Sequence, residues 1–381
     1  MNISLITFAR FPTEKAYGIH LVQVAKGFIE NGAEVKIIYP STKNRNTISI
    51  SPSSYYEEVD RLTYQQIENY DLTGKKLFNL LPNFLQMVGW VLNLLFWVLK
   101  NKAEILDKSE YIWSTNPIII YLLKKDKKQF IYEKHGPAKR VQRIAIKLIA
   151  KENNVTAVGV TKQSHLELKK LNFKNNLYLP NGVDLNIFNN KGRKKKNRIS
   201  IGYAGSLETY GVDKGVLTSI KSILDIETQI FDIFIYGGPQ NKLDEISNLV
   251  ESFEYEGIVK IENYVNYKEV GKALKSFDIG IVPYPDEFHM SNYASPMKIF
   301  ELAASGCAII ASDIDSHKEI TDMGIEMLLF KSGDWDDFKN KLIELAHNED
   351  MRNSMVLRNL TTIKKFSWSN RANKILTSKR L

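Results

Sequence analysis

The chain has 381 residues and a formal net charge of +9 at pH 7, with 44% apolar and 25% charged residues, which is typical of a folded globular protein with two domains. A single cysteine, Cys307, excludes an intrachain disulfide and favours a reducing compartment. The positive charge favours anionic partners. Because zinc-finger, RNP-type and basic-zipper patterns are absent from the sequence, we do not expect nucleic acid among them.

The first forty residues predict a βαβ unit, with strands over 3–8 and 34–39 and a helix over 18–29. The apolar start lacks a basic n-region and a cleavage site of small residues, so we expect a strand and not a signal peptide. The loop 9–18 contains no Gly-x-Gly-x-x-Gly, which argues against a nicotinamide or flavin dinucleotide site here.

The next hundred residues begin with a polar, turn-rich segment, 41–75, which we expect on the surface. The segment 84–99 is apolar almost all round but shorter than the roughly 20 residues that a membrane span needs. We therefore predict a buried core helix, with a helix lying in a membrane interface as the alternative. Lysines flank it at Lys75, Lys76, Lys100 and Lys102.

Two further strands are predicted over 112–117 and 129–137, each ending in a polar loop. In open parallel sheets such strand ends line the ligand crevice. His135 stands at the second of these ends and is a candidate site residue, with an ordinary core or surface histidine as the alternative.

The helix predicted over 138–152 carries a basic residue at every fourth position, which places these side chains on one face. We expect this basic stripe to lie opposite the apolar residues Val141, Ile144, Leu148 and Ile149. The stripe is either a solvated face or a surface for anionic lipid head groups. Its members are Lys139, Arg143, Lys147 and Lys151.

The second half of the chain begins after a basic, unpatterned segment, 191–198, which we interpret as a hinge linker. A predicted strand then leads into Gly205 and Ser206. A polar loop follows, and Lys214 and Gly215 stand immediately before the next helix.

The segment 295–314, SPMKIFELAASGCAIIASDI, predicts a helix followed by a buried strand. Ser295 suits the N-cap, Pro296 the first helical position and Gly306 the end of the helix.

This helix has the features of a nucleotide-binding element. Its start presents free N–H groups and the positive end of the helix dipole, which suit a phosphate. Glu301 lies on the same face as Met297 and Lys298, where a carboxylate can accept hydrogen bonds from a ribose diol. The alternative is an ordinary amphipathic helix with a surface glutamate.

These motifs, in this order, resemble those of GT-B glycosyltransferases, specifically the retaining family 4. The resemblance covers nearly the whole chain and rests on the Pro-x-Lys-x-Phe-Glu helix at 296–301, the Asn-Gly-Val-Asp turn at 181–184, the Lys214–Gly215 loop and the ending FSWSNRANKIL. It implies an α/β fold of two Rossmann-like βαβ domains facing a central cleft. Residues 1–190 would bind the acceptor, 191–365 the nucleotide sugar, and 366–381 would form a helix crossing back to the first domain.

The resemblance implies a retaining glycosyltransferase that moves a sugar from a nucleotide-diphosphate donor to a hydroxyl acceptor, by front-side displacement with a diphosphate oxygen as base. The six histidines form no cluster at metal spacing along the sequence, so we expect that no metal is used, and no cofactor is expected besides the donor. His135, Lys214 and Glu301 are the implied catalytic residues. The implied donor-binding residues are Gly18, Gly205, Ser206, Lys214, Val265, Tyr293, Ser295, Pro296, Met297, Lys298 and Glu301.

Two positions depart from the family pattern. Tyr293 stands where the first Glu of the Glu-x7-Glu signature is usual, and Ser206 stands where an arginine is often found, so Lys298 is expected to supply the missing cation. The alternatives are a catalytically impaired GT-B domain acting as a partner or sugar-binding subunit, and a sugar-nucleotide 2-epimerase. We expect a cytoplasmic protein, peripheral on the inner face of the membrane if it uses a lipid-linked acceptor in cell-envelope polysaccharide or glycolipid assembly.

Overall fold

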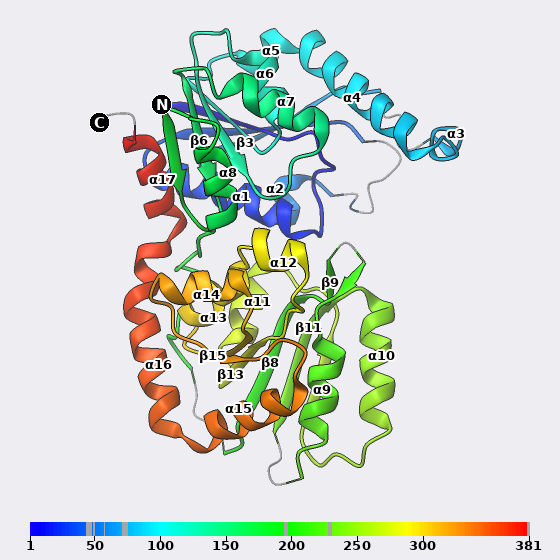
Figure 1. Cartoon of the computed structure of the whole chain (residues 1–381), viewed down its shortest axis with the longest axis vertical. Helices are drawn as coiled ribbons and strands as arrows, with labels where there is room; N and C mark the ends of the chain where they lie inside the picture. The colour runs from blue at the N-terminus through cyan, green and yellow to red at the C-terminus, as the bar shows by residue number, and fades with distance from the viewer. Residues whose placement is uncertain are drawn as a thin grey trace. The chain divides into compact units, whose positions relative to one another are not determined.

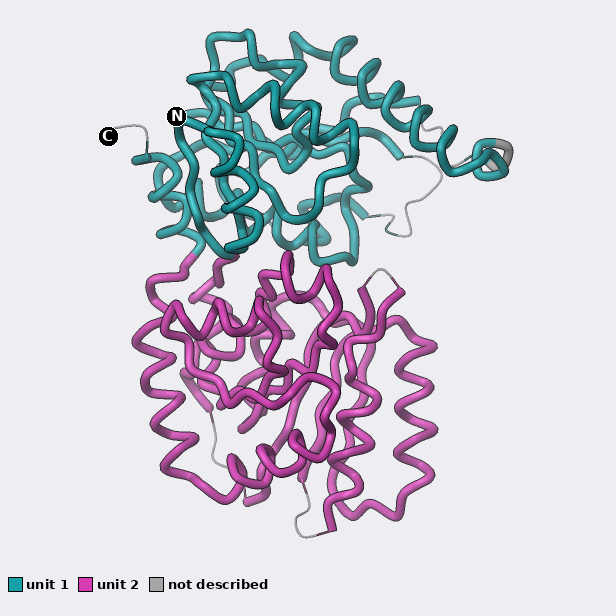
Figure 2. Tube along the Cα trace, in the orientation of Figure 1, with its two compact units in different colours: residues 1–180, 368–381 teal, residues 181–367 magenta. Residues whose placement is uncertain are grey.

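The computed structural model describes residues 1–42, 48, 50–56, 58–70, 75–193, 197–209, 211–227 and 231–378. The chain divides into two compact units, unit 1 (residues 1–180 and 368–381) and unit 2 (residues 181–367), shown in Figure 2. The chain therefore passes between the units twice, after Pro180 and before Trp368. Part of the predicted linker, 194–196, lies outside the described residues.

Unit 1 is built on a seven-stranded, fully parallel sheet in the order β3-β2-β1-β4-β5-β6-β7 (Figure 1). Parallel neighbours need crossover connections, which helices supply here. The strand order reverses between β1 and β4, and ligands bind beside such a switch point at the carboxyl ends of the strands. The strands are β1 (Asn2–Ile6), β2 (Glu34–Pro40), β3 (Leu62–Ile67), β4 (Tyr111–Ser114), β5 (Gln129–Lys134), β6 (Val155–Gly159) and β7 (Asn175–Tyr178).

The helices of unit 1 include one that returns from the far end of the chain. The C-terminal helix packs along α1, and a Cβ atom on Gly27 would lie 2.4 Å from the carbonyl oxygen of Trp368, so this contact requires glycine. The crossing helix was expected and is confirmed. The helices are α1 (Ala16–Glu30), α2 (Pro52–Tyr56), α3 (Lys76–Asn79), α4 (Asn83–Lys100), α5 (Lys102–Leu106), α6 (Pro117–Leu123), α7 (Arg140–Ile149), α8 (Lys162–Lys169) and α17 (Trp368–Thr377).

Unit 2 has a six-stranded parallel sheet in the order β12-β11-β8-β13-β14-β15, and a small antiparallel hairpin, β9–β10. Its switch point lies between β8 and β13. The strands are β8 (Ser200–Ser206), β9 (Glu208–Thr209), β10 (Val212–Asp213), β11 (Asp232–Gly238), β12 (Val259–Glu262), β13 (Ile279–Val282), β14 (Ala308–Ser312) and β15 (Leu328–Phe330).

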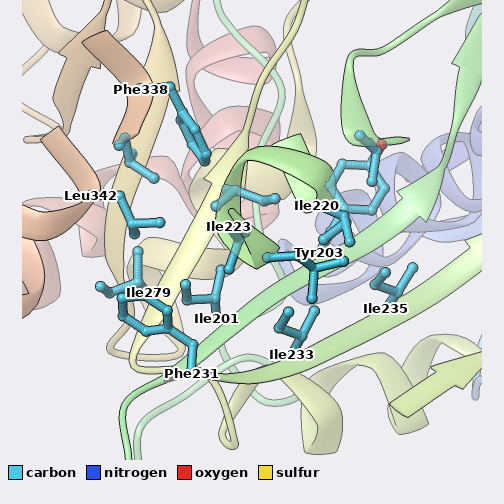
Figure 3. Packing of buried hydrophobic residues seen from close by; sticks show 14 of the residues in the cluster. Ile201, Tyr203, Ile220, Ile223, Phe231, Ile233, Ile235, Ile279, Phe338 and Leu342 are labelled. Atoms are coloured by element: carbon cyan, nitrogen blue, oxygen red, sulfur yellow. The ribbon is translucent and has the colours of Figure 1, made fainter. Parts of the chain in front are cut away.

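Helices cover both faces of this sheet, as the buried apolar runs of its strands require. Figure 3 shows one face, where Ile201 and Ile233 of the sheet lie near Ile220 and Ile223 of α9. The helices are α9 (Val216–Leu224), α10 (Gln240–Glu251), α11 (Tyr267–Leu274), α12 (Phe288–Tyr293), α13 (Met297–Ala304), α14 (Asp315–Asp322), α15 (Trp335–His347), α16 (Glu349–Thr362) and the 3-10 turn η1 (Ile363–Phe366).

Several local expectations differ from the structure. Residues 62–67 of the segment that we expected as polar, turn-rich surface form the edge strand β3, paired with β2. Unit 2 begins at Asn181 and not near residue 191, because Val183 and Phe188 pack in its core.

The apolar helix α4 is not a core helix, and this prediction was wrong. Only Asn93, Leu94, Trp97 and Val98 of its residues are buried. Phe84, Leu85, Val88, Leu92, Phe96 and Leu99 are exposed, and its remaining apolar side chains are partly buried. Helix α4 extends beyond the sheet of unit 1 (Figure 1). Among the described residues, α4 is the one helix that is long and apolar enough to cross a membrane.

The basic stripe of α7 also has a different setting from the one expected. Val141 and Ile144 are exposed, 37% and 56%, so they lie on the solvent side with the basic residues and not opposite them. The buried face of α7 is formed by Ala145, Ile146 and Ile149.

Candidate active site

The carboxyl end of β8 in unit 2 brings backbone and a lysine unusually close together. Gly205 has a backbone φ of +135°, which residues other than glycine rarely adopt. A Cβ atom there would lie 3.0 Å from Lys298 Nζ. Glycine therefore allows the ammonium group of Lys298, from α13, to approach the end of β8 at the switch point of the sheet.

Two lysines gather around aromatic rings at this place. Lys298 Nζ lies 3.5 Å from the ring centre of Tyr203 and 5.5 Å from that of Tyr284, and Lys214 Nζ lies 5.2 Å from the ring centre of Tyr284. These are cation–π distances. Lys298 Nζ is buried and has no hydrogen-bond partner among the described residues.

Both lysines have lowered pKa values. Burial lowers the pKa of Lys214 to about 8. Burial, together with the charge of Lys214, holds the pKa of Lys298 well below its usual range, although Glu301 acts in the opposite direction. Two desolvated amines side by side are costly, and a bound anion would relieve this cost. The arrangement therefore suits a negatively charged ligand.

Glu301 lies one turn further along α13 and is 7% exposed. The Tyr267 hydroxyl, from the first residue of α11, donates a hydrogen bond of 2.8 Å to Glu301 Oε1. Burial raises the pKa of Glu301 to about 7, against the effects of Tyr267 and Lys298. Glu301 is not the surface glutamate of an ordinary amphipathic helix.

The start of α13 differs by one residue from the sequence prediction. The helix begins at Met297 with Pro296 at the N-cap, so Ser295 does not cap it. The Ser295 hydroxyl accepts a hydrogen bond of 3.0 Å from the backbone N–H of Asn181, and its carbonyl accepts one of 2.7 Å from Asn181 Nδ2. The Asn-Gly-Val-Asp turn thus fixes the segment before α13.

Three other predicted donor residues have structural partners. The Ser206 hydroxyl donates to the carbonyl of Glu208 at 2.6 Å. Tyr293 is buried at the end of α12, where it packs edge-on against Phe288. Val265 is partly buried against the core of unit 2.

Gly18, expected at the start of the first helix, lies inside it as the third residue of α1, which begins at Ala16. It belongs to unit 1, whereas the other predicted donor residues belong to unit 2. A Cβ atom on Gly18 would lie 2.1 Å from Tyr56 Oη and 2.7 Å from the Thr13 side chain. Its packing against these two residues is a sufficient structural reason for glycine here.

In unit 1, His135 belongs to a cluster that the sequence analysis missed. At its centre is Glu133, the fully buried fifth residue of β5. Glu133 Oε1 lies 2.7 Å from His135 Nε2 and 3.1 Å from His20 Nε2. Glu133 Oε2 accepts from the Trp113 indole at 3.1 Å and pairs with Arg371 at 2.9 Å. An acidic residue inside an otherwise buried strand was the signal that could have revealed it.

The charges of this cluster are matched. Burial acts to raise the pKa of Glu133, but Arg371, the hydrogen bond from His135 and the nearby His20 hold it well below the usual range. Burial and the neighbouring His135 lower the pKa of His20 to about 4. His20, Glu133 and His135 offer ligand atoms within 4.8 Å of one another, the spacing of a metal site. Because Arg371 already neutralises Glu133, we assign no metal to them.

Comparisons with known proteins support a functional assignment of this fold. Residues 198–348 match the family model described as "Glycosyl transferases group 1". No curated protein matches the sequence.

Solved structures with low sequence identity share the fold over the whole chain. Sucrose-phosphate synthase from Thermosynechococcus elongatus has a TM-score of 0.73 and 14% identity, covering 100% of this chain and 98% of that one. HepE from Anabaena, solved with UDP and glucose, has a TM-score of 0.68 and 13% identity, covering 100% of this chain and 99% of that one. A TarM mutant from S. aureus was solved with Fondaparinux, α-GlcNAc-glycerol and UDP. It has a TM-score of 0.69 and 12% identity, covering 99% of each chain. The chain therefore has the GT-B fold of these structures, and its residues 198–348 match the glycosyl transferases group 1 model.

Proposed function

We propose that the chain transfers a sugar, with retention of configuration, from a nucleoside-diphosphate donor to a hydroxyl acceptor. The observation that carries the proposal is the pair of desolvated lysines, Lys214 and Lys298, at the carboxyl ends of the central strands of unit 2. Such a pair suits a diphosphate. HepE was solved with UDP-glucose and TarM with UDP, which makes uridine diphosphate the first donor leaving group to test.

The residues of unit 2 have separate roles in this proposal. Lys214 and Lys298 stabilise the negative charge that grows on the departing diphosphate, where preorganised cations in a desolvated site act strongly. Glu301, held by Tyr267, accepts hydrogen bonds from the ribose hydroxyls. The donor is a substrate, and the proposed reaction uses no metal or other cofactor. Retention follows from the resemblance to family 4.

The proposed diphosphate role of Lys214 predicts a defect in turnover. Lys214→Ala should lower kcat by about 10²–10³-fold, the range for losing one donor to a developing negative charge, and should also raise KM. Lys298→Ala should act in the same direction. The measurement is release of nucleoside diphosphate across a panel of nucleotide sugars, with Lys221→Ala, an exposed lysine on α9, as the control.

The outcomes of this panel separate the alternatives. An unchanged kcat with a raised KM would make Lys214 a binding residue only. Tight donor binding by the wild type without turnover of any donor would favour the impaired domain that Tyr293 first suggested. Formation of an epimerised nucleotide sugar would favour the 2-epimerase.

The ribose role of Glu301 predicts a binding defect. Glu301→Ala should weaken UDP binding by about 1–3 kcal/mol, the cost of losing hydrogen bonds to a charged group. Titration calorimetry measures this change, with Glu251→Ala on the exposed end of α10 as the control. Unchanged affinity would overturn the assignment.

The same titration should depend on pH. Glu301 accepts hydrogen bonds best when deprotonated, above its pKa of about 7, and Lys214 is charged below its pKa of about 8. Wild-type affinity for UDP should therefore be highest between about pH 7 and 8.

For the acceptor, we propose a lipid-linked saccharide of cell-envelope polysaccharide or glycolipid assembly, used by a cytoplasmic enzyme at the inner face of the membrane. The support comes from exposed apolar and basic side chains on α4 and α7, both of which pack against α6. We name this set the α4–α7 surface. It consists of Phe84, Leu85, Val88, Leu92, Phe96, Leu99, Lys139, Val141, Arg143, Ile144, Lys147 and Lys151.

Apolar side chains interleaved with basic ones are typical of helices that lie in the interface of an anionic membrane. On α4, Phe84, Val88, Leu92 and Phe96 recur every fourth residue and are exposed by 36–67%. Lys100, at the end of α4, lies 6.0 Å from the ring centre of Phe96. A row of this kind is unfavourable in water and favourable in an interface.

A further inference from the structure

The buried carboxylate of unit 1 holds four side chains, three from separate elements and one from the loop after β5. His135 follows β5, Trp113 is in β4, His20 in α1 and Arg371 in α17. Glu133 is 0% exposed and Arg371 5% exposed, whereas the His135 side chain is 33% exposed. The charged pair of the cluster, Glu133 and Arg371, is therefore buried, and His135 is the member that reaches solvent.

The geometry determines which nitrogen of His135 carries a proton. Nε2 lies 2.7 Å from an ionised carboxylate oxygen, and a neutral imidazole at this distance donates from Nε2 and leaves Nδ1 as an acceptor. A carboxylate beside a histidine commonly fixes the tautomer and the orientation of the ring in this way. The nitrogen that Glu133 does not hold, Nδ1, is the one left for a ligand.

Arg371 connects this carboxylate to both places where the chain passes between the units. Its Nε donates to the carbonyl of Pro180 at 2.8 Å and its NH2 group to that of Leu179 at 3.4 Å. Pro180 is the last residue before the first crossing, and Arg371 stands three residues after the second, at Trp368. The guanidinium thus ties Glu133 to the ends of the two connecting segments.

We propose that Glu133 is a positioning residue that orients His135 with Nε2–H toward the carboxylate and Nδ1 as the acceptor. Arg371 keeps Glu133 ionised and ties it to the two connecting segments. The proposal about the tautomer stands on this cluster alone. Its consequence for turnover rests on the proposed function, with His135 as one of the catalytic residues that the resemblance to family 4 implies.

The substitution Glu133→Gln tests the proposal because all its partners donate. A glutamine amide has one accepting oxygen and one donating NH2 group, so it cannot accept from His135 on one side and from Trp113 and Arg371 on the other. Glu133→Asp keeps the charge and should partly restore the arrangement. Glu34→Gln makes the same chemical change at an exposed residue of β2 and serves as the control.

The first measurement is nitrogen NMR of the full chain labelled at histidine, recorded at pH 8. We expect His135 in the Nε2–H form in the wild type and in Glu34→Gln, a mixture of both tautomers in Glu133→Gln, and a return toward the first form in Glu133→Asp. His317, whose Nδ1 donates to the carbonyl of Ser312 in unit 2, should keep its signals and report that unit 2 is folded.

Two results would overturn the proposal. One is a wild-type spectrum with His135 mainly in the Nδ1–H form, which needs no variant to fold. The other is an unchanged His135 tautomer in Glu133→Gln.

Turnover supplies a separate readout. Glu133→Gln should lower kcat by about 10–100-fold, the range known for hydrogen-bond partners of metal-bound histidines, with a smaller change in KM, and Glu133→Asp should recover part of it. If the tautomer shifts while His135→Ala and Glu133→Gln both keep full kcat, the positioning by Glu133 stands and the proposed role of His135 in transfer fails.

Discussion

Replacing Arg371 by methionine is expected to lower the free energy of unfolding of unit 1 by about 3–5 kcal/mol, the usual cost of leaving one partner of a buried ion pair uncompensated. Glu133 would remain fully buried with only His135, His20 and the Trp113 indole around it. Methionine has a similar length and keeps much of the packing, so the loss reports mainly the missing charge and its hydrogen bonds. Urea unfolding followed by tryptophan fluorescence measures it.

Fluorescence is well suited to unit 1 because four of the five tryptophans belong to it: Trp90, Trp97, Trp113 and Trp368. Lys374→Met removes a positive charge from an exposed position of the same helix and should change stability by less than about 0.5 kcal/mol. The double variant Glu133→Gln/Arg371→Met should recover part of the loss, because no lone buried charge remains. A single variant as stable as the wild type would show that the pair contributes nothing.

The loss of stability in Arg371→Met should also depend on pH. The pKa of His20 is lowered to about 4 by burial, by His135 and by the positive charge of Arg371, whereas Glu133 acts to raise it. Removing Arg371 raises this pKa, so the variant takes up a proton at mildly acidic pH that the wild type does not, and this proton compensates Glu133. The difference in stability between the two proteins should therefore be smaller at pH 5.5 than at pH 8.

The elements that sequence patterns predicted best are those specified by neighbouring residues. The run CAIIA forms β14, buried at every position, and Gly306, with a φ of +74°, ends α13 as expected. The predicted helix start failed by one residue because a distant backbone N–H, that of Asn181, takes the Ser295 hydroxyl. A capping preference cannot reveal a competing partner 114 residues away.

Burial was harder to predict than secondary structure. Composition gave α4 an apolar surface on nearly every side, but burial depends on which elements cover a helix, and α6 covers only part of it. In the same way, β3 was missed because an edge strand with polar residues lacks the apolar run of a central strand.

In the candidate site too, residues in local motifs were predicted, and a residue with partners distant in sequence was missed. Lys214, Lys298 and Glu301 lie in short motifs whose order along the chain carried the prediction. Glu133 was missed because its partners come from positions 20, 113, 135 and 371, and no local pattern connects them. The long-range packing of α1 and α17 is what assembles this cluster.

The proposed membrane role predicts binding to anionic vesicles that depends on the four residues of the basic stripe, which lie in α7 and just beyond its two ends. Each lysine or arginine near an anionic surface contributes about 1 kcal/mol, so four contribute about 4 kcal/mol, or about a thousandfold in affinity. Reversing the charge at Lys139, Arg143, Lys147 and Lys151 with glutamate should therefore abolish co-sedimentation with anionic vesicles at low salt. The wild type should be released near about 0.5 M salt, where the screening length falls to a few ångströms.

A matched control separates this surface from net charge. Glutamate at Lys169, Lys170, Lys174 and Lys374, exposed residues of unit 1 outside the α4–α7 surface, lowers the net charge equally and should leave most of the binding intact. Serine at Leu92 and Phe96 should weaken binding without changing its salt dependence, because each buried apolar side chain contributes about 1.5–3 kcal/mol independently of charge. If the wild type ignores anionic vesicles at low salt, or the control set binds as poorly as the α7 set, the surface has another role and the lipid-linked acceptor loses its structural support.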